Sequence, residues 1–165
     1  MDSTPKSPLI FVAPEEKDRR GQPGACIVVG LSRDEVSRIL KAPGNLKHQA
    51  LLAIIYGSGL RVSEAVRLRA EHIESKRMLV RIEQSKGRKD RYTILSKSCL
   101  DLLREYWRTY QPGEWLFFAK DKNRPMPSET AQKIYHLAKQ KAGVTRGRGI
   151  HTLRHYAEFL TMPSQ

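Results

Sequence analysis

Three short segments of this 165-residue sequence contain side chains that can act on a phosphate ester. The first is Arg61, which follows a glycine-containing turn at residues 57–60 and begins a predicted helix. A guanidinium and backbone N–H groups at such a position can be directed at an anion. An arginine at a helix start is also commonly an ordinary surface residue, so Arg61 alone does not establish a site.

The second segment is a polar turn at residues 85–91, between two predicted strands. It contains four cations, Lys86, Arg88, Lys89 and Arg91. A turn of this length can enter a nucleic-acid groove or cap a phosphate. A bare run of charge can equally be a solvated loop, and the nucleic-acid interpretation gains weight only from the charge of the whole chain.

The third segment contains His151 and Arg154, which are separated by two residues. On a helix this spacing places both side chains on the same side of one turn. Because a histidine and an arginine at this spacing occur often by chance, the pair becomes informative only together with the two preceding segments.

The charge of the whole chain favours a polyanionic partner. Thirty Lys and Arg residues against 17 Asp and Glu give a formal net charge of +13, with a pI near 10.0. DNA or RNA is the first interpretation of such an excess. The same charge also fits a chain that is merely solubilised by it, a ribosomal role or a membrane-surface role.

Cysteine usage and hydropathy indicate the cellular environment. Cys26 and Cys99 lie far apart and outside any zinc-ligand spacing, so they predict reduced thiols rather than a disulfide framework or a metal site. No apolar run has the length of a membrane span, and the first residues lack the apolar core of a signal peptide. We therefore expect a soluble, cytoplasmic protein without membrane contact.

The length suits a single folded domain preceded by an arm. Residues 1–30 contain four prolines and a charged stretch, which predicts an unstructured segment. The sequence from residue 31 onward has regular apolar patterns. The expected organisation is therefore an arm at residues 1–30 and one domain at residues 31–165.

Local patterns predict the elements of that domain. Ser32 and Glu35 have the spacing of a capping box and begin a helix at residues 32–41. Further helices are expected at 46–56, from 62, at 98–110, from a Ser128 cap, and at 151–160. Extended runs at 78–83 and 92–95 predict an antiparallel hairpin. The predicted fold class is α+β, mainly helical with a small antiparallel β-hairpin or sheet.

Apolar residues near the polar segments are expected in the core. Leu60, Val66 and Leu153 belong to this set. The apolar positions of the helix after Ser128 are Ile134, Leu137 and Ala138. Glycines in residues 143–149 predict a mobile basic connector before the last helix.

The polar segments, taken together and in order, resemble the tyrosine recombinase family of phage integrases. The motifs are Gly59-Leu60-Arg61-Val62-Ser63-Glu64, Ser85-Lys86-Gly87-Arg88-Lys89-Asp90-Arg91 on a hairpin, and His151-Thr152-Leu153-Arg154-His155. The resemblance covers residues 31–155, including the opening helix. It implies a mostly helical catalytic domain that clamps duplex DNA during site-specific recombination and integration, with other recombinase protomers as candidate partners.

The resemblance also implies catalytic roles for four residues. Arg61 and Arg154 match the pair that holds the non-bridging phosphate oxygens, where negative charge develops during attack. His151 matches the position that assists proton transfer, and Lys86 matches the hairpin lysine that protonates the departing 5′ oxygen. These catalytic residues need no cofactor, and we find no acidic cluster spaced for Mg²⁺.

Other motif residues receive supporting or DNA-binding roles. Arg88, Lys89 and Arg91 are the expected DNA-binding residues of the hairpin. Glu64 and His155 match motif positions as well, and we interpret both as framework residues that orient their neighbours.

The sequence departs from the family pattern after His155. In the family, further helices with a Gly-His motif and the nucleophilic tyrosine follow. Here Tyr156 is two residues beyond Arg154, so a helix would turn it away from the His151 face. No nucleophile is therefore assigned, and we expect a domain truncated at its C-terminus that cannot cleave DNA alone.

The front of the sequence is also short for the family. Residues 1–30, which include four prolines, cannot form the separate core-binding domain that completes the DNA clamp in relatives. We expect reduced affinity and selectivity for DNA, and marginal stability where terminal helices would have covered apolar surface.

Three alternatives remain open at this point. A partner that retains its tyrosine could supply the nucleophile in trans. The chain could instead be a non-enzymatic DNA-binding remnant or a regulator of an intact recombinase. An RNA-binding protein that uses the basic hairpin is a third interpretation, although it leaves the order of the motifs unexplained.

Overall fold

Helix α1 (Arg33–Lys41) begins where the sequence predicts it. In the computed structural model, which describes residues 31–83 and 89–154, the Ser32 hydroxyl accepts the N–H of Glu35 at 3.2 Å. The Glu35 carboxylate returns the contact by accepting the N–H of Ser32 at 2.7 Å. This reciprocal pair satisfies two N–H groups at the helix start, so the predicted capping box is confirmed. Val36 and Ile39 form its buried side.

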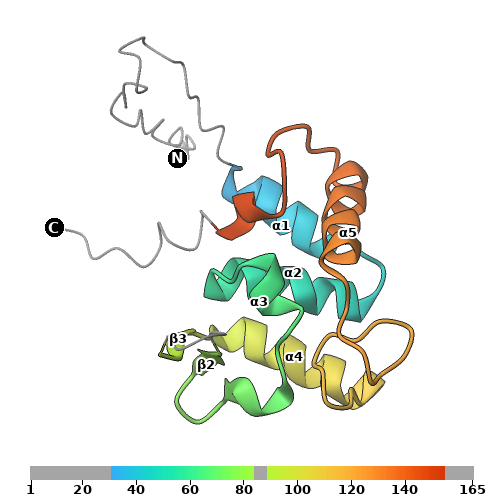
Figure 1. The fold of residues 1–165 in the computed structure, drawn as a ribbon. Coiled ribbons are helices and arrows are strands. Elements are labelled where there is room, and N and C mark those ends of the chain that lie inside the picture. The colour runs from blue at the N-terminus through green and yellow to red at the C-terminus, as the bar shows by residue number, and fades with distance from the viewer. Residues whose placement is uncertain (1–30, 84–88, 155–165) are drawn as a thin grey trace, which may run out of the picture.

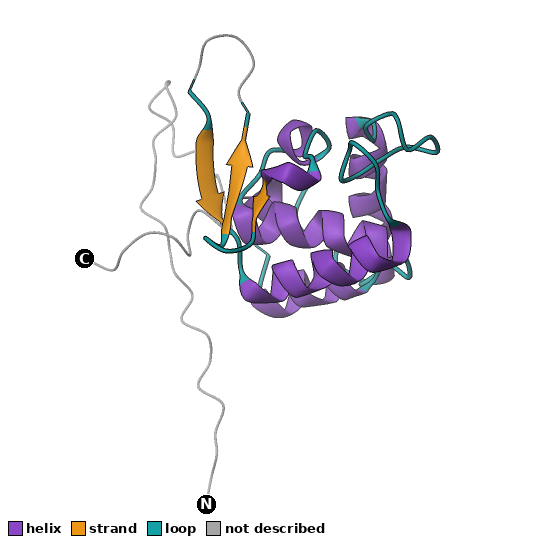
Figure 2. Cartoon of the chain, turned by 90° about the horizontal axis from the view of Figure 1, so that it is seen from below, coloured by secondary structure: helices purple, strands orange, loops and turns teal. Residues whose placement is uncertain are grey.

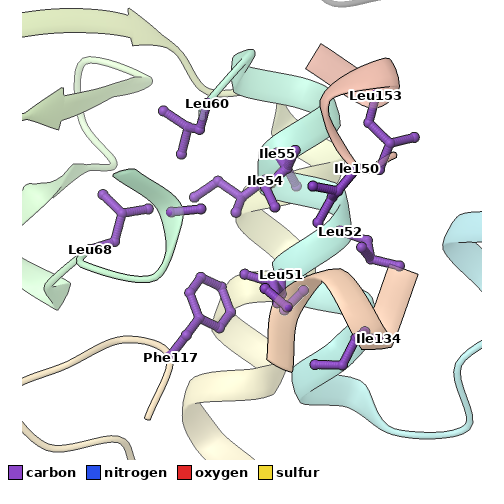
Figure 3. Packing of buried hydrophobic residues seen from close by; sticks show 14 of the residues in the cluster. Leu51, Leu52, Ile54, Ile55, Leu60, Leu68, Phe117, Ile134, Ile150 and Leu153 are labelled. Carbon is purple, nitrogen blue, oxygen red and sulfur yellow. The ribbon is translucent and has the colours of Figure 1, made fainter. Parts of the chain in front are cut away.

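Helix α2 (Leu46–Ser58) is the central element of the fold. Figure 1 shows it between α1 and α5 (Ser128–Lys141) on one side and α4 (Lys97–Tyr110) on the other. Because neighbours cover both sides, its apolar residues surround the helix instead of forming one stripe. Its fully buried members are Ala50, Leu51, Leu52, Ile54 and Ile55, several of which are drawn in Figure 3.

The end of α2 differs slightly from the sequence prediction. Gly57 and Ser58 continue the helix, and only Gly59 terminates it. Gly59 has φ 63° and ψ 34°, the left-handed conformation that commonly follows a helix C-terminus. The chain then enters α3 (Val62–Ala65), a single turn that is followed by a 3₁₀ turn at Ala70–His72.

The predicted hairpin is present, with one additional strand. β2 (Leu79–Ile82) pairs antiparallel with β3 (Arg91–Ile94), with Val80 opposite Thr93 and Ile82 opposite Arg91. A third strand, β1 (Ile73–Glu74), pairs on the other side of β2. The sheet order is β1-β2-β3, and Figure 2 shows the sheet beside the helices.

Helix α4 begins with a side-chain cap that was not predicted, whereas α5 lacks the cap predicted for it. The Ser96 hydroxyl accepts the N–H of Cys99 at 3.3 Å and caps α4. At α5, Pro127 is the N-cap and Ser128 is the first helical residue, so the prediction that Ser128 caps the helix is wrong. Proline is favoured near a helix start because its fixed φ suits the first turn and it has no N–H to satisfy.

The segment at residues 115–118, whose structure the sequence leaves undecided, completes the core below α2. The Tyr106 hydroxyl donates to the Leu116 carbonyl at 2.7 Å, and its ring stacks on Phe117 with centroids 5.7 Å apart. Isolated bridges join Arg69 to Trp115 and Phe118 to Pro125. Two parts of the core prediction are confirmed, since Leu60 and Val66 are at most 4% exposed.

The predictions about the two cysteines and about membrane contact concern residues that the structure describes only in part. Cys99 is a buried free cysteine, and burial raises the pKa of its thiol to about 12. Cys26 and the predicted arm at residues 1–30 lie outside the described residues. Within residues 31–83 and 89–154, no helix is long and apolar enough to cross a membrane.

Candidate functional site

Arg61 is the N-cap of α3 and extends into solvent. Its side chain is 61% exposed, and its backbone N–H donates to Glu64 Oε2 at 2.7 Å. An arginine side chain has only donors, so it cannot complete a capping box with the helix N–H groups. Glu64 binds the Arg61 N–H, so this one backbone donor is not available to an anion. The exposed guanidinium is the group of Arg61 that a phosphate can reach.

Glu64 has the framework role predicted for it. Its side chain is 13% exposed, and Oε2 also accepts a hydrogen bond from Arg91 Nη2 at 2.7 Å. Its second oxygen, Oε1, lies 3.7 Å from Arg61 Nη1. One half-buried carboxylate thus contacts the Arg61 backbone, the Arg61 guanidinium and a guanidinium of the hairpin.

A cleft of about 330 Å³ opens beside Arg61. Arg67 and Arg69 line the same cleft, together with the Trp115 ring. Arg69 is engaged within the protein, because its guanidinium lies over that ring at 5.0 Å and contacts Glu114 at 3.1 Å. Arg67 is exposed. The cleft was not predicted from the sequence, since its residues come from three elements.

Three residues near this cleft could be considered as metal ligands. Ligand atoms of Glu71, His72 and Glu83 all lie within 4.8 Å of one another. However, His72 Nδ1 accepts the N–H of Arg69 at 3.2 Å, which places the ring proton on Nε2. Nε2 lies 3.1 Å from Glu83 Oε1, but it makes no hydrogen bond with the described residues. A histidine that binds a metal through Nε2 would carry its proton on Nδ1 instead. In His72 that proton would point at the Arg69 N–H, so the observed hydrogen bond disfavours a metal ligand here.

His151 and Arg154 lie on a helical turn at residues 151–154. The turn is anchored by Ile150 and Leu153, which are 5% and 0% exposed and belong to the same buried cluster as Ile55 of α2, drawn in Figure 3. The core prediction for Leu153 is thereby confirmed. His151 is exposed and Arg154 is partly exposed, as their three-residue spacing requires if both lie on the solvent side.

The connector before this turn is held in place by several contacts. The Lys139 ammonium donates to the Gly147 carbonyl, and the Val144 N–H donates to the Lys139 carbonyl at 3.1 Å. A Cβ at Gly149 would lie 2.9 Å from the His151 ring, so a side chain there would have to displace the imidazole. Contacts with α5 therefore hold the connector that leads to His151, a segment for which the sequence predicts mobility.

Arg61 and the turn that carries His151 and Arg154 both lie near the C-terminal end of α2. Arg61 follows the C-terminus of α2, and Ile150, directly before the 151–154 turn, shares a buried cluster with Ile55 near that same end. Lys89 is exposed, whereas Arg91 is half-buried against Glu64. Lys86, Arg88 and His155, and the predicted helix beyond residue 154, lie outside the described residues.

A prediction concerns Gly59, which sets the direction of the chain before Arg61. A residue with a Cβ is strained at its positive φ, so Gly59→Ala is expected to lower the free energy of unfolding by about 1 kcal/mol. The matched control is Gly44→Ala, because φ is not positive at Gly44 and a Cβ would meet no atom within 4 Å. Urea denaturation of both variants gives the comparison. Equal losses would show that the left-handed conformation at Gly59 is not required.

Comparison with known proteins finds that the chain is similar to integrases and recombinases. The sequence model of the Phage integrase family matches residues 30–160. A putative integrase/recombinase of Sinorhizobium fredii, y4qK, is 42% identical over 125 residues, which are 76% of this chain and 41% of that protein. Tyrosine recombinase XerA of Pyrococcus horikoshii is 32% identical over 128 residues, 76% of this chain and 44% of the relative. The chain therefore spans less than half the length of these two relatives.

Solved structures share the fold. The crystal structure of XerA recombinase superposes with a TM-score of 0.71 at 23% identity, covering 78% of this chain and 47% of that one. A lambda integrase dimer bound to a COC′ core site gives a TM-score of 0.65 at 19% identity, covering 79% of this chain and 51% of that one.

Proposed function

Because the chain belongs to the phage integrase family, we propose that it binds duplex DNA and holds the scissile phosphate of a site-specific recombination reaction. The observation that carries this proposal is Arg61. Its guanidinium is exposed at the start of α3, beside a cleft, while Glu64 fixes its backbone. A net charge of +13 favours a polyanionic partner.

The proposed chemistry is transfer of a DNA phosphate to a tyrosine hydroxyl. Attack on phosphorus breaks the bond to the 5′ oxygen and increases negative charge on the two non-bridging oxygens. Arg61 and Arg154 bind those oxygens with charge-assisted hydrogen bonds, which strengthen as the charge develops. His151 holds the same phosphate and accepts the proton that the tyrosine hydroxyl releases, and Lys86 gives its proton to the departing 5′ oxygen.

The attacking tyrosine is proposed to come from outside the described residues. Tyr106 and Tyr135 are buried, Tyr56 of α2 packs against the core, and the Tyr110 hydroxyl donates to Asn45 at 3.0 Å. Tyr92 is exposed, but it follows Arg91 on β3 and so lies on the opposite face of the sheet from the Glu64 contact. A second protomer is a suitable source, because the solved lambda integrase relative is a dimer on its DNA site.

The first test of this proposal is a salt-titrated binding assay. We expect duplex DNA to bind more tightly than single-stranded RNA of equal length, with affinity that falls linearly on a double-logarithmic salt plot. A clear preference for the RNA would overturn the DNA proposal and favour an RNA-binding protein that uses the basic hairpin.

A second test addresses the chemical step. The chain is incubated with a nicked duplex and a recombinase partner that retains its tyrosine but lacks its own catalytic arginines. A phosphotyrosyl adduct on the partner, absent when that tyrosine is replaced by Phe, is the expected result. If no adduct forms in either mixture, the chain does not provide a working phosphate site in trans.

A further inference from the structure

Two side chains of β3 contact the turn that carries Arg61, one on each side of it. Arg91 Nη2 donates to Glu64 Oε2 at 2.7 Å, and Thr93 Oγ1 donates to the Ser58 carbonyl at 2.7 Å. Arg91 and Thr93 are two residues apart on a strand, so they face the same way. Ser58 precedes Arg61 by three residues and Glu64 follows it by three. The strand therefore holds both ends of the turn.

The carboxylate of Glu64 lies between two guanidinium groups at unequal distances. Arg91 is hydrogen-bonded to it at 2.7 Å, whereas the nearest ion-pair distance from the Arg61 guanidinium is 3.7 Å. The Arg91 side chain is 34% exposed and that of Arg61 is 61% exposed. The less exposed Arg91 thus neutralises the Glu64 carboxylate, and the guanidinium of Arg61 remains in solvent.

Loss of Arg91 would change this balance. A half-buried carboxylate without a partner is costly, so it pairs with the nearest cation available. For Glu64 that cation is Arg61, which has to move its guanidinium only a short distance to form a direct hydrogen bond. The same movement would withdraw Arg61 from a bound phosphate.

We propose that Arg91 is a positioning residue that neutralises Glu64 and so keeps the Arg61 guanidinium available to the DNA phosphate. Thr93 supports the same turn from its other end. The inference rests on the proposed function, and it assigns to Arg91 a role different from the DNA contact expected from the sequence.

The two roles of Arg91 predict different results in a double-mutant cycle. If Arg91 acts through Arg61, Arg91→Met weakens duplex-DNA binding about tenfold, but adds little to Arg61→Ala. If Arg91 contacts a phosphate directly, the two losses add, and the salt slope decreases by about one for Arg91→Met even in the Arg61→Ala background. Additive losses would therefore overturn the proposal.

Removal of Glu64's charge provides a suppressor test. In the Glu64→Gln/Arg91→Met variant no carboxylate competes for Arg61, and glutamine can still accept the Arg61 N–H. Most of the affinity lost in Arg91→Met is expected to return, and Arg91→Lys should retain part of it from the start. The matched control is Arg77→Met with and without Glu74→Gln, an ion pair of the same sheet with an N–O distance of 3.1 Å. Recovery no larger than in this control pair would contradict the inference.

A measurement without DNA separates this inference from the proposed function. Hydrogen exchange at the Arg61 side-chain Nε–H, followed by NMR, is expected to slow about tenfold in Arg91→Met as the guanidinium pairs with Glu64. Arg77→Met should leave that rate unchanged. Unchanged exchange in Arg91→Met would overturn the positioning role even if the chain binds DNA. Slowed exchange in a chain that does not bind DNA would instead sink the proposed function alone.

Discussion

Arg61→Ala combined with Arg154→Ala is expected to weaken binding of duplex DNA about a hundredfold at fixed salt, because each arginine contributes about a factor of ten through a phosphate contact. The slope of log affinity against log salt should decrease in magnitude by about two, one for each lost contact. Fluorescence anisotropy at several salt concentrations measures both quantities. Circular dichroism of the variant establishes that it retains its helices.

The control for this prediction removes the same charge elsewhere. Arg104 and Arg108 are exposed on α4, which lies on the other side of α2 from α1 and α5 (Figure 1). Their replacement by alanine should reduce affinity less than about threefold, since long-range attraction alone is screened by salt. Equal losses in the two double variants would mean that DNA is attracted only by net charge. That result would favour a non-enzymatic DNA-binding module over a phosphate-holding site.

The second large effect concerns the helix that supports the site. Leu51→Ala is expected to lower the free energy of unfolding by about 3 kcal/mol, because it removes a buried side chain and leaves a cavity. Leu51 is 0% exposed in α2 and lies beside Phe117 in Figure 3. Urea denaturation measures the loss as a lower midpoint with an unchanged slope.

Leu137→Ala provides a control with the same change in side chain. Leu137 is 61% exposed on α5, so its replacement should change the free energy of unfolding by no more than about 0.5 kcal/mol. Both leucines are helical, which makes the propensity difference similar in the two variants. A loss at Leu137 as large as that at Leu51 would show that this part of α5 is covered in solution.

The sequence was sufficient for features whose causes are local. The capping box of Ser32 and Glu35 involves residues three apart, so its spacing alone predicted the start of α1. Gly59 before Arg61 and the polar run between two extended segments likewise located the α2–α3 turn and the hairpin. The motif order also indicated the family, because Arg61, Lys86, His151 and Arg154 are identified by residue type and sequence context.

Packing decided details that the sequence pattern left open. Ile134, Leu137 and Ala138 are all apolar positions of one predicted helix, yet α5 packs through Ala131, Ile134, Tyr135 and Ala138. Leu137 lies off that stripe and remains exposed. Likewise, the two-residue strand β1 has too short a pattern to be predicted, and it exists because β2 offers it hydrogen-bonding partners.

What the sequence determined by itself is therefore most of the helices, the β2–β3 hairpin and the residue types that can hold a phosphate. Only the tertiary structure decided what each charged group contacts. Arg91 belonged to a basic run in the sequence, and the fold pairs it with Glu64, 27 residues away. Such a pair leaves no periodic signal, because it depends on how β3 lies against α3. The availability of Arg61 is thus set by a contact that only the folded chain brings together.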